Sequence, residues 1–329
     1  MGIVFNKGGI FTTVQDYGRM GYQNLGFHVC GVMDRHSYWA ANLLVDNTDR
    51  EAVLEFTIQG PTLYFTSDTV ICITGGDFDP RINGEEIPMY TAVEVKKGDE
   101  LEMGFCRVGT WGYIAFAGGL DVPVVMGSRS TDIKCRLGGY QGRPIKDGDE
   151  IEFVSNIKSL PYMKDRRLER PDYYGADVVD LRVTLGPQDD HFTEEGLNSF
   201  LLGEYTVTSQ CDRMGYRLDG PAIQHNELGA DIISDGIAKG AIQVPSSGQP
   251  IIMMSDRQTL GGYTKIANVI SVDIAKLAQC RYPQKVSFTR VSVEEAQRIY
   301  MMERERFRLL NDRFLKRSIW HRLFAHWKN

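Results

Sequence analysis

The feature that most constrains this chain is a recurrence of short β-like runs separated by turn residues. From residue 1 to about 160, runs such as Thr62-Leu63-Tyr64-Phe65 alternate with Gly, Asp and Asn, and Asn83-Gly84 and Asp147-Gly148 are strong turn dipeptides. A second block of this kind runs from Leu181 to about Val291. Many short strands with frequent turns are typical of barrels and sandwiches, so the sequence predicts a mainly β fold with a few short helices.

The length of the chain indicates two domains. A chain of 329 residues is long for one core and comfortable for two. We expect one β domain over residues 1–160 and a second over 179–291, because each range holds one of the two blocks. Basic residues and prolines over 161–178 indicate a linker or surface loop between them.

Residues 292–329 differ from both blocks and predict a basic helical tail. Ser292 and Glu295 form a capping box, and helix formers without Pro or Gly follow. Docking of this helix on its own domain or on a partner is the favoured interpretation, and a membrane-surface helix is the alternative. The residues expected to share its apolar face are Trp320, Leu323, Phe324 and Trp327, and its basic residues are Arg313, Lys316, Arg317, Arg322 and Lys328.

Two short helices are expected inside the β blocks. Asp34 to Ser37 can begin the first, and the segment through Leu44 would carry its apolar face. The second is expected around Glu194–Asn198.

Charge and composition exclude several classes of function. The net charge of -6 provides no electrostatic reason to expect nucleic acid as a partner. No apolar stretch approaches the roughly 20 residues that a membrane-spanning helix needs, and the N-terminus lacks the pattern of a signal peptide. The 6 cysteines are scattered without a Cys-x-x-Cys pair, which indicates reduced thiols and a cytoplasmic location. No metal site is expected.

The most informative passage for function runs from residue 234 to residue 267. Two apolar runs each lead into a dense polar cluster, and the second cluster places an acid, a guanidinium and an amide ahead of a double glycine. Burying such a mixture unpaired would be costly, whereas a site that orients a small polar molecule needs it. A buried ion pair between Asp256 and Arg257 is the structural alternative. We predict catalytic roles for Asp256, Arg257, Gln258 and Lys265, and substrate binding by Gln243, Gly261, Gly262 and Tyr263.

Two clusters in the first block provide further candidates for substrate binding. In Thr12 to Tyr22, glycines would let backbone amides approach a ligand beside a carboxylate and a guanidinium, or Asp16 and Arg19 would simply pair across a turn. In Gly31 to Arg35, capping of a helix by Asp34 is the structural alternative. The predicted substrate-binding residues here are Asp16, Arg19, Asp34, Arg35 and Arg129.

The ordered series of motifs resembles one family along residues 1 to 290. It is similar to the family of 5-oxoprolinase C subunits, also described as Kip A-type or biotin-dependent carboxyltransferase-like proteins, and to the carboxyltransferase domain of urea carboxylase. The matching motifs are Thr12-Thr13-Val14-Gln15-Asp16, Met33-Asp34-Arg35, Ala41-Asn42-Leu43-Leu44-Val45, Gly60-Pro61-Thr62-Leu63, Gly118-Gly119-Leu120-Asp121-Val122-Pro123, Gly127-Ser128-Arg129-Ser130-Thr131-Asp132, Gly186-Pro187-Gln188-Asp189-Asp190, Asp212-Arg213-Met214-Gly215-Tyr216-Arg217-Leu218 and the 234–267 passage.

The resemblance implies two tandem β-barrel domains similar to cyclophilin, with the site between them. It also implies partnership with a Kip I-like protein, the B subunit of 5-oxoprolinase, and with a LamB/YcsF-like protein, its A subunit. The assembled enzyme would open 5-oxoproline to glutamate at the expense of ATP. The sequence has no glycine-rich phosphate loop. We therefore expect ATP, with Mg, to be bound by the assembled complex.

Two alternatives stay open at this stage. A Kip A-type chain would bind a Kip I-like kinase inhibitor and act as a regulator. A carboxyltransferase component would act on urea or a similar amide with carboxybiotin, and the biotin would come from another protein because no Met-Lys-Met attachment motif occurs here.

Overall fold

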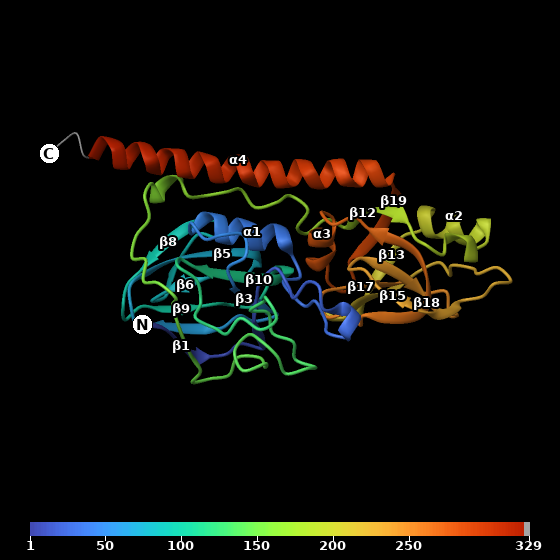
Figure 1. Cartoon of the computed structure of the whole chain (residues 1–329), viewed down its shortest axis with the longest axis horizontal. Helices are drawn as coiled ribbons and strands as arrows, with labels where there is room; N and C mark the ends of the chain where they lie inside the picture. Colours follow the sequence, from blue (N-terminus) through green and yellow to red (C-terminus); the bar gives the residue numbers. More distant parts are fainter. Residues whose placement is uncertain (326–329) are drawn as a thin grey trace. The chain divides into compact units, whose positions relative to one another are not determined.

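The computed structural model describes residues 1–325, with the side chains of the C-terminal helix described through Phe314. The chain is mainly β, with a few short helices and one long C-terminal helix, as predicted (Figure 1). Two compact units form. The first unit comprises Met1–Tyr17, Arg35–Pro171 and the chain from Met301 onward, and the second comprises Gly18–Asp34 and Asp172–Tyr300. The boundaries expected from the sequence are consecutive, whereas these units are assembled from interleaved segments.

The first unit contains two antiparallel sheets around one core. One sheet has the strand order β11-β1-β4-β9-β6-β7 and the other β2-β3-β10-β5-β8. Apolar side chains of both sheets, including Phe5, Phe56, Phe65, Ile73 and Phe116, form one buried cluster, so the sheets pack face to face. The strands are β1 (Gly2–Lys7), β2 (Phe11–Gln15), β3 (Val53–Thr57), β4 (Thr62–Phe65), β5 (Thr69–Asp77), β6 (Arg81–Ile82), β7 (Glu85–Glu86), β8 (Ala92–Val95), β9 (Glu100–Glu102), β10 (Val108–Phe116) and β11 (Glu150–Glu152).

The predicted turn at Asn83-Gly84 is confirmed by the backbone. Asn83 and Gly84 have φ values of 53° and 85° and connect β6 directly to β7. This two-residue connection with positive φ at both positions suits Asn-Gly better than any other pair.

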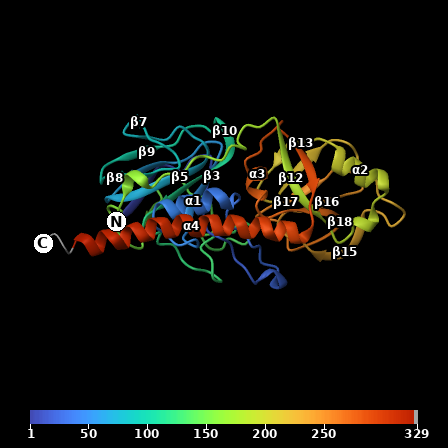
Figure 2. The same ribbon diagram turned by 90° about the horizontal axis from the view of Figure 1, so that it is seen from above.

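One helix packs on the five-stranded sheet of the first unit, and the C-terminal helix packs on that first helix. Helix α1 (Arg35–Leu44), predicted from the sequence, packs on β5 and β10, where Thr74 Oγ1 donates to the carbonyl of Ser37 at 2.8 Å. The C-terminal helix α4 (Val293–Ala325) runs beside α1 in both views (Figures 1 and 2). His36 Nδ1 lies 2.6 Å from Glu303 Oε1, and the rings of Trp39 and Phe307 meet edge-on. The docked part of this helix therefore belongs to the first unit.

The second unit is a closed barrel. Its eight-stranded sheet has the order β12-β19-β13-β14-β17-β16-β18-β15, and β12 also pairs with β18, so every strand except β15 joins a ring. The strands are β12 (Val178–Leu185), β13 (Tyr205–Cys211), β14 (Gly215–Asp219), β15 (Asp231–Gly236), β16 (Ala241–Val244), β17 (Ile251–Met253), β18 (Leu260–Val269) and β19 (Lys285–Arg290). The predicted helix around residues 194–198 is α2 (Glu194–Leu202), capped by Thr193, whose Oγ1 accepts from the N–H of Gly196 at 2.9 Å. Helix α3 (Ile274–Ala278) follows β18.

Short 3-10 turns complete the two units. They are η1 (Gln23–Leu25), η2 (Met163–Asp165) and η3 (Asp189–His191).

The segment expected as a linker is partly integrated into the first unit. Arg166 is only 1% exposed, and its guanidinium donates to the carbonyls of Pro161 and Leu44 and to Oδ1 of Asp46. Three acceptors compensate the burial of this charge. Phe314 of α4 lies under the same guanidinium, with its ring centroid 5.3 Å away, and is itself buried.

The N-cap half of the predicted capping box at the start of α4 is confirmed, whereas the carboxylate of Glu295 pairs with Arg298. Ser292 Oγ accepts from the N–H of Glu295 at 3.1 Å. The side chains of Trp320, Leu323, Phe324 and Trp327, and those of Lys316, Arg317, Arg322 and Lys328, lie outside the described residues. Within residues 1–325, none of the helices combines the length and the apolar character needed to span a bilayer.

Candidate functional site

The polar face of the barrel in the second unit brings together two predicted site residues. Gln243 on β16 and Lys265 on β18 are direct partners across the antiparallel ladder, so their side chains lie on the same face. Both are buried, with 2% and 3% of their surface exposed. Two buried polar side chains side by side are a feature that a purely structural strand pair avoids.

Gln243 is the most unusual residue of this pair. Its Nε2 is fully buried and has no hydrogen-bond partner among the residues that the structure describes. Leaving such a donor unsatisfied costs about 1–3 kcal/mol, so native proteins rarely keep one without a reason. A ligand atom that accepts from this amide provides such a reason.

A cavity of about 500 Å³ opens beside Gln243 in the second unit. Gln258 and Tyr263, two further predicted site residues, are part of its lining and are exposed. The volume is that of a small-molecule pocket, and amide, hydroxyl and guanidinium groups converge on it. The lining residues are Ser209, Gln210, Cys211, Asp212, Met214, Gly215, Arg217, Gln243, Ile251, Met253, Gln258 and Tyr263.

The double glycine ahead of Tyr263 has a steric explanation. A methyl group on Gly261 would lie 2.7 Å from Nε2 of Gln243 and 3.1 Å from Nε2 of Gln258. The missing side chain thus lets both amides approach the same point of β18. At Gly262 a methyl group would meet only atoms at 3.4 Å or more, so the demand for glycine is weaker there.

Lys265 forms an ion pair and a hydrogen bond with two residues that the sequence did not indicate as part of the site. Its Nζ lies 3.3 Å from Oδ2 of Asp235 on β15, and its backbone N–H donates to Oε1 of Gln188 at 3.2 Å. The hydrogen bond from the N–H of Gly236 lowers the pKa of Asp235, and Lys265 lowers it further. Asp235 lies in the 234–267 passage, but its selection needed the β15–β18 pairing, which the sequence does not reveal.

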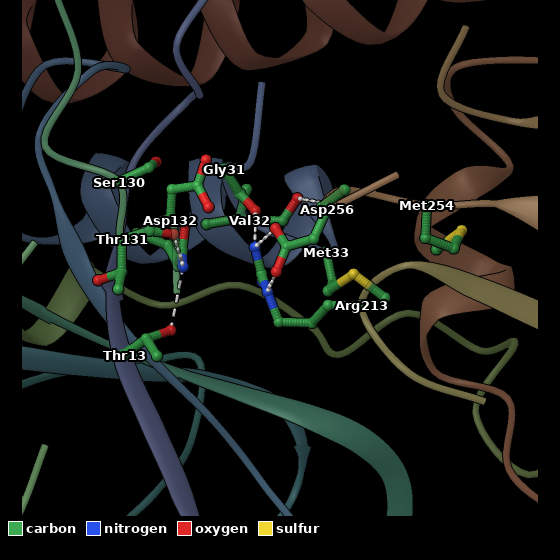
Figure 3. Close-up of polar contacts among 12 residues, drawn as sticks. Thr13, Gly31, Val32, Met33, Ser130, Thr131, Asp132, Arg213, Met254 and Asp256 are labelled. Atoms are coloured by element: carbon green, nitrogen blue, oxygen red, sulfur yellow. Dashed lines mark hydrogen bonds and ion pairs between the residues drawn. The ribbon is translucent and has the colours of Figure 1, made fainter. Parts of the chain in front are cut away.

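Asp256 and Arg257, predicted as catalytic, are both engaged in structural contacts. Asp256 forms a two-point ion pair with Arg213, with distances of 2.8 Å from Nε to Oδ2 and 2.7 Å from Nη2 to Oδ1 (Figure 3). Arg257 is buried and donates to the backbone carbonyls of Ile237 and Met254. The ion pair considered for Asp256 therefore exists, but its partner is Arg213 and not the neighbouring Arg257.

In the first unit, Asp16 anchors the loop that carries Arg129. Its carboxylate accepts from Ser128 Oγ at 2.7 Å, from the N–H of Arg129 at 2.6 Å and from Ser130 Oγ at 2.5 Å. Nη1 of Arg129 lies 3.7 Å from Oε2 of Glu51, while its Nε is buried without a hydrogen-bond partner in the described part of the chain. Asp16 is thus a positioning group for this loop, and Arg129 keeps donor capacity.

The three remaining candidates lie at or next to the ends of the segment Gly18–Asp34, which is part of the second unit. Arg19 and Asp34 are fully buried and belong to the second unit, where Asp34 accepts from Nε2 of Gln279 at 2.9 Å. Arg35 begins α1 in the first unit and stacks over the ring of Tyr17 at 4.2 Å.

The fold and the polar barrel face define a class of protein, a carboxyltransferase-like module built from two β units. The family model described as "Carboxyltransferase domain, subdomain A and B" matches residues 25–290. The chain belongs to this family.

Two curated relatives match along most of their own length. The chain is 36% identical to the C subunit of 5-oxoprolinase from Escherichia coli (strain K12) over 294 residues, which is 88% of this chain and 91% of the relative. It is 33% identical to the C subunit of 5-oxoprolinase from Haemophilus influenzae over 291 residues, covering 87% of this chain and 90% of that protein.

A solved structure shares the fold. The crystal structure of the Kluyveromyces lactis urea carboxylase superposes with a TM-score of 0.86 at 29% identity and covers 94% of this chain. The chain spans only 29% of that protein, so the whole activity of the larger protein does not transfer from this match.

Proposed function

We propose that this chain is the C subunit of an ATP-dependent 5-oxoprolinase, a hydrolase that opens the 5-oxoproline lactam to L-glutamate. The observation that carries the proposal is the match to the Escherichia coli C subunit over 91% of that protein. The structure adds a pocket of suitable size whose buried amide lacks a partner among the described residues.

The chemistry of the pocket suits a small planar amide. A lactam carbonyl oxygen needs hydrogen-bond donors, and more strongly as it gains negative charge during attack. The Nε2 group of Gln243 is an available donor, and Gln258 lies beside it at Gly261. Lys265 is not part of the cavity lining, but it lies on the same face as Gln243, and its ammonium group is paired with Asp235. In this proposal Gln243 orients the carbonyl and Lys265 stabilises the charge that develops.

The carboxylate of 5-oxoproline needs a cation, and Arg217 is the best candidate. Arg217 is exposed on β14 and lines the cavity. A guanidinium binds a carboxylate through two parallel hydrogen bonds, which fixes the orientation of the ring. In the proposal it replaces Arg19 and Arg35, whose described surroundings are buried or stacked.

The cavity does not fit ATP. Among its lining residues Arg217 is the one cation, and Asp212 lies in the same lining, whereas a triphosphate requires several positive groups or a cluster of backbone amides. We therefore derive no step through ATP from these residues. In our proposal ATP and Mg²⁺ are bound with the help of partner subunits.

The relatives are named as C subunits, and this name motivates the proposed partners. We propose that this chain assembles with a Kip I-like B subunit and a LamB/YcsF-like A subunit. The cytoplasm is the proposed location, on the basis of the cysteine spacing.

Reconstitution tests the proposal. The chain is co-purified with its A and B subunits, and glutamate release from 5-oxoproline is measured with and without ATP. We expect release that requires all three chains and ATP, and a loss in Lys265→Met but not in Lys285→Met, because Lys285 forms an exposed ion pair with Glu204 in the same unit. Absence of glutamate release from the complete, folded complex would refute the proposal.

Carboxyl transfer to an amide is the second candidate. The matched family model and the Kluyveromyces lactis urea carboxylase favour it. Under this alternative the barrel face binds urea or a similar amide, and carboxybiotin arrives on another protein. Urea-dependent consumption of carboxybiotin by the chain, without glutamate release by the complex, would favour this candidate.

A further inference from the structure

The segment Gly18–Asp34 belongs to the second unit although the residues on both sides of it belong to the first. Its local sequence does little to fix one conformation. Four glycines in it have positive φ, and its one regular element is the three-residue turn η1. Glycine-rich backbone is costly to order, so contacts with the rest of the unit must hold this segment. The glycines are Gly18, Gly21, Gly26 and Gly31.

Three side chains of the second unit donate hydrogen bonds to consecutive backbone carbonyls near the end of this segment. Arg213 Nη2 donates to the carbonyl of Gly31 at 2.9 Å. Ser255 Oγ donates to the carbonyl of Val32 at 3.0 Å. Lys239 Nζ donates to the carbonyls of Val32 and Met33 at 2.8 and 3.2 Å. Two cationic side chains and one hydroxyl thus donate hydrogen bonds to three consecutive carbonyls, which is more than an ordinary loop contact provides.

The Arg213 side chain is itself held in position by Asp256. The carboxylate accepts two hydrogen bonds from the guanidinium, and the N–H of Asp256 donates to the carbonyl of Arg213 at 2.7 Å. Only 5% of the Arg213 side chain and 15% of the Asp256 side chain are exposed, so solvent screens this pair weakly. A two-point pair fixes the plane of the guanidinium, and this leaves Nη2 directed at Gly31 (Figure 3).

The gripped backbone is locally strained. Cys30 has a φ of 54°, in the left-handed region that non-glycine residues rarely adopt, and Gly31 follows with a φ of 79°. Such a conformation persists where the surroundings determine it, and it concentrates at functional sites. The strain lies directly before the carbonyls held by Arg213 and Lys239.

We propose that Asp256, Arg213 and Lys239 form a clamp of positioning residues that holds the segment Gly18–Asp34 on the second unit. Asp256 acts through Arg213 and not on the substrate. The clamp keeps the segment that carries Arg19 and Asp34 in one conformation. An effect of the clamp on turnover rests on the proposed function, whereas its effect on the conformation of the segment does not.

Hydrogen exchange of the full-length chain tests the clamp without any substrate. In Asp256→Asn and Lys239→Met we expect amides of residues 18–34 to exchange faster by about tenfold or more, because each change removes charge-assisted hydrogen bonds from the contacts that hold the segment. Asp256→Glu keeps the carboxylate and should restore most of the protection. The matched control is Arg298→Gln, which removes a two-point arginine–carboxylate pair on the exposed side of α4. Unchanged protection of residues 18–34 in folded Asp256→Asn and Lys239→Met would overturn the proposal.

A second readout separates positioning from chemistry. In the reconstituted complex, Asp256→Asn should lower kcat/KM without altering the shape of its pH profile, and Asp256→Glu should recover much of the loss. A pH profile that loses one limb in Asp256→Asn would instead identify Asp256 as a proton carrier and overturn its positioning role. If the wild-type complex releases no glutamate, the proposed function fails, and the exchange experiment still decides whether the clamp exists.

Discussion

Replacing Gln243 with Met should make the second unit more stable and the protein less active. Gln243 is 2% exposed, and its Nε2 has no hydrogen-bond partner among the described residues. Met has the same unbranched length and no polar atom that needs a partner, so it fits the site without overpacking.

The expected magnitude follows from the cost of the unsatisfied donor. Burial of an unpaired amide N–H costs about 1–3 kcal/mol in protein mutants, and its removal returns that amount less small packing losses. We expect the free energy of unfolding to rise by about 1–2 kcal/mol. Glutamate release should fall, because the donor to the lactam carbonyl is lost.

Gln15 provides a matched control in the first unit. It is also fully buried, but its Nε2 donates to Thr13 Oγ1 at 3.1 Å and to the carbonyl of Thr131 at 3.2 Å. Its Oε1 has no hydrogen-bond partner in the described part of the chain, which offsets part of the loss. Gln15→Met should therefore lower the stability of the first unit by about 1 kcal/mol. The two glutamines are expected to give shifts of opposite sign.

The two units can be followed separately. The second unit, residues 18–34 and 172–300, contains no tryptophan, whereas Trp39 and Trp111 lie in the first. Tryptophan fluorescence during urea denaturation therefore reports the first unit, and hydrogen exchange of the β16 and β18 amides reports the second. A loss of stability of more than about 1 kcal/mol in Gln243→Met would show that the amide is bonded in the native state, and the reasoning would be refuted.

Two further predictions concern ion pairs that hold elements in place. Burial raises the pKa of Asp273, but hydrogen bonds from Arg182 on β12 outweigh it, so the pKa lies below the ordinary value of 3.8. The carboxylate therefore contributes stability above pH 3.8 that is lost as the pH falls through its folded pKa. Asp273→Asn should lower the free energy of unfolding by about 2–3 kcal/mol at neutral pH and remove this acid dependence, as measured by hydrogen exchange of β12. A decrease below about 1 kcal/mol would contradict this prediction. In the first unit, burial raises the pKa of Glu303, but the hydrogen bond to His36 and its charge lower it overall. Glu303→Gln should weaken the docking of residues 301–314 of α4 and speed their cleavage by trypsin. Glu305→Gln is the control and should not, because the Glu305 carboxylate pairs with Arg308 in an exposed position. Equal cleavage of both variants would count against the role of His36.

Much of the secondary structure was predictable because it depends on local patterns. The turn at Asn83-Gly84, the helix after Asp34 and the N-cap at Ser292 each follow from the conformational preferences of a few adjacent residues. The segment 18–34 was not predictable in the same way. Its assignment to the second unit depends on Arg213, Lys239 and Ser255, which lie about two hundred residues away in sequence.

The candidate site was also predictable only in part. Chemical composition identified the 234–267 passage, and Gln243, Gln258 and Tyr263 line the cavity of the second unit. The catalytic roles of Asp256 and Arg257 stay predictions, and their contacts with Arg213 and with backbone carbonyls could not be read from the sequence. Spacing along a strand indicates which side chains share a face, but not which of them are already paired.

The sequence by itself determined the mainly β class, the family resemblance and the passage that carries the polar groups, since residue types, alternation and turn chemistry are local properties. Only the tertiary structure decided that Asp256 pairs with Arg213 and that the Gln243 amide is left unsatisfied, within the described residues, beside a cavity. The physical reason is that the free energy of a buried polar group depends on its partners, and those partners are supplied by pairing between strands and not by neighbours in the chain.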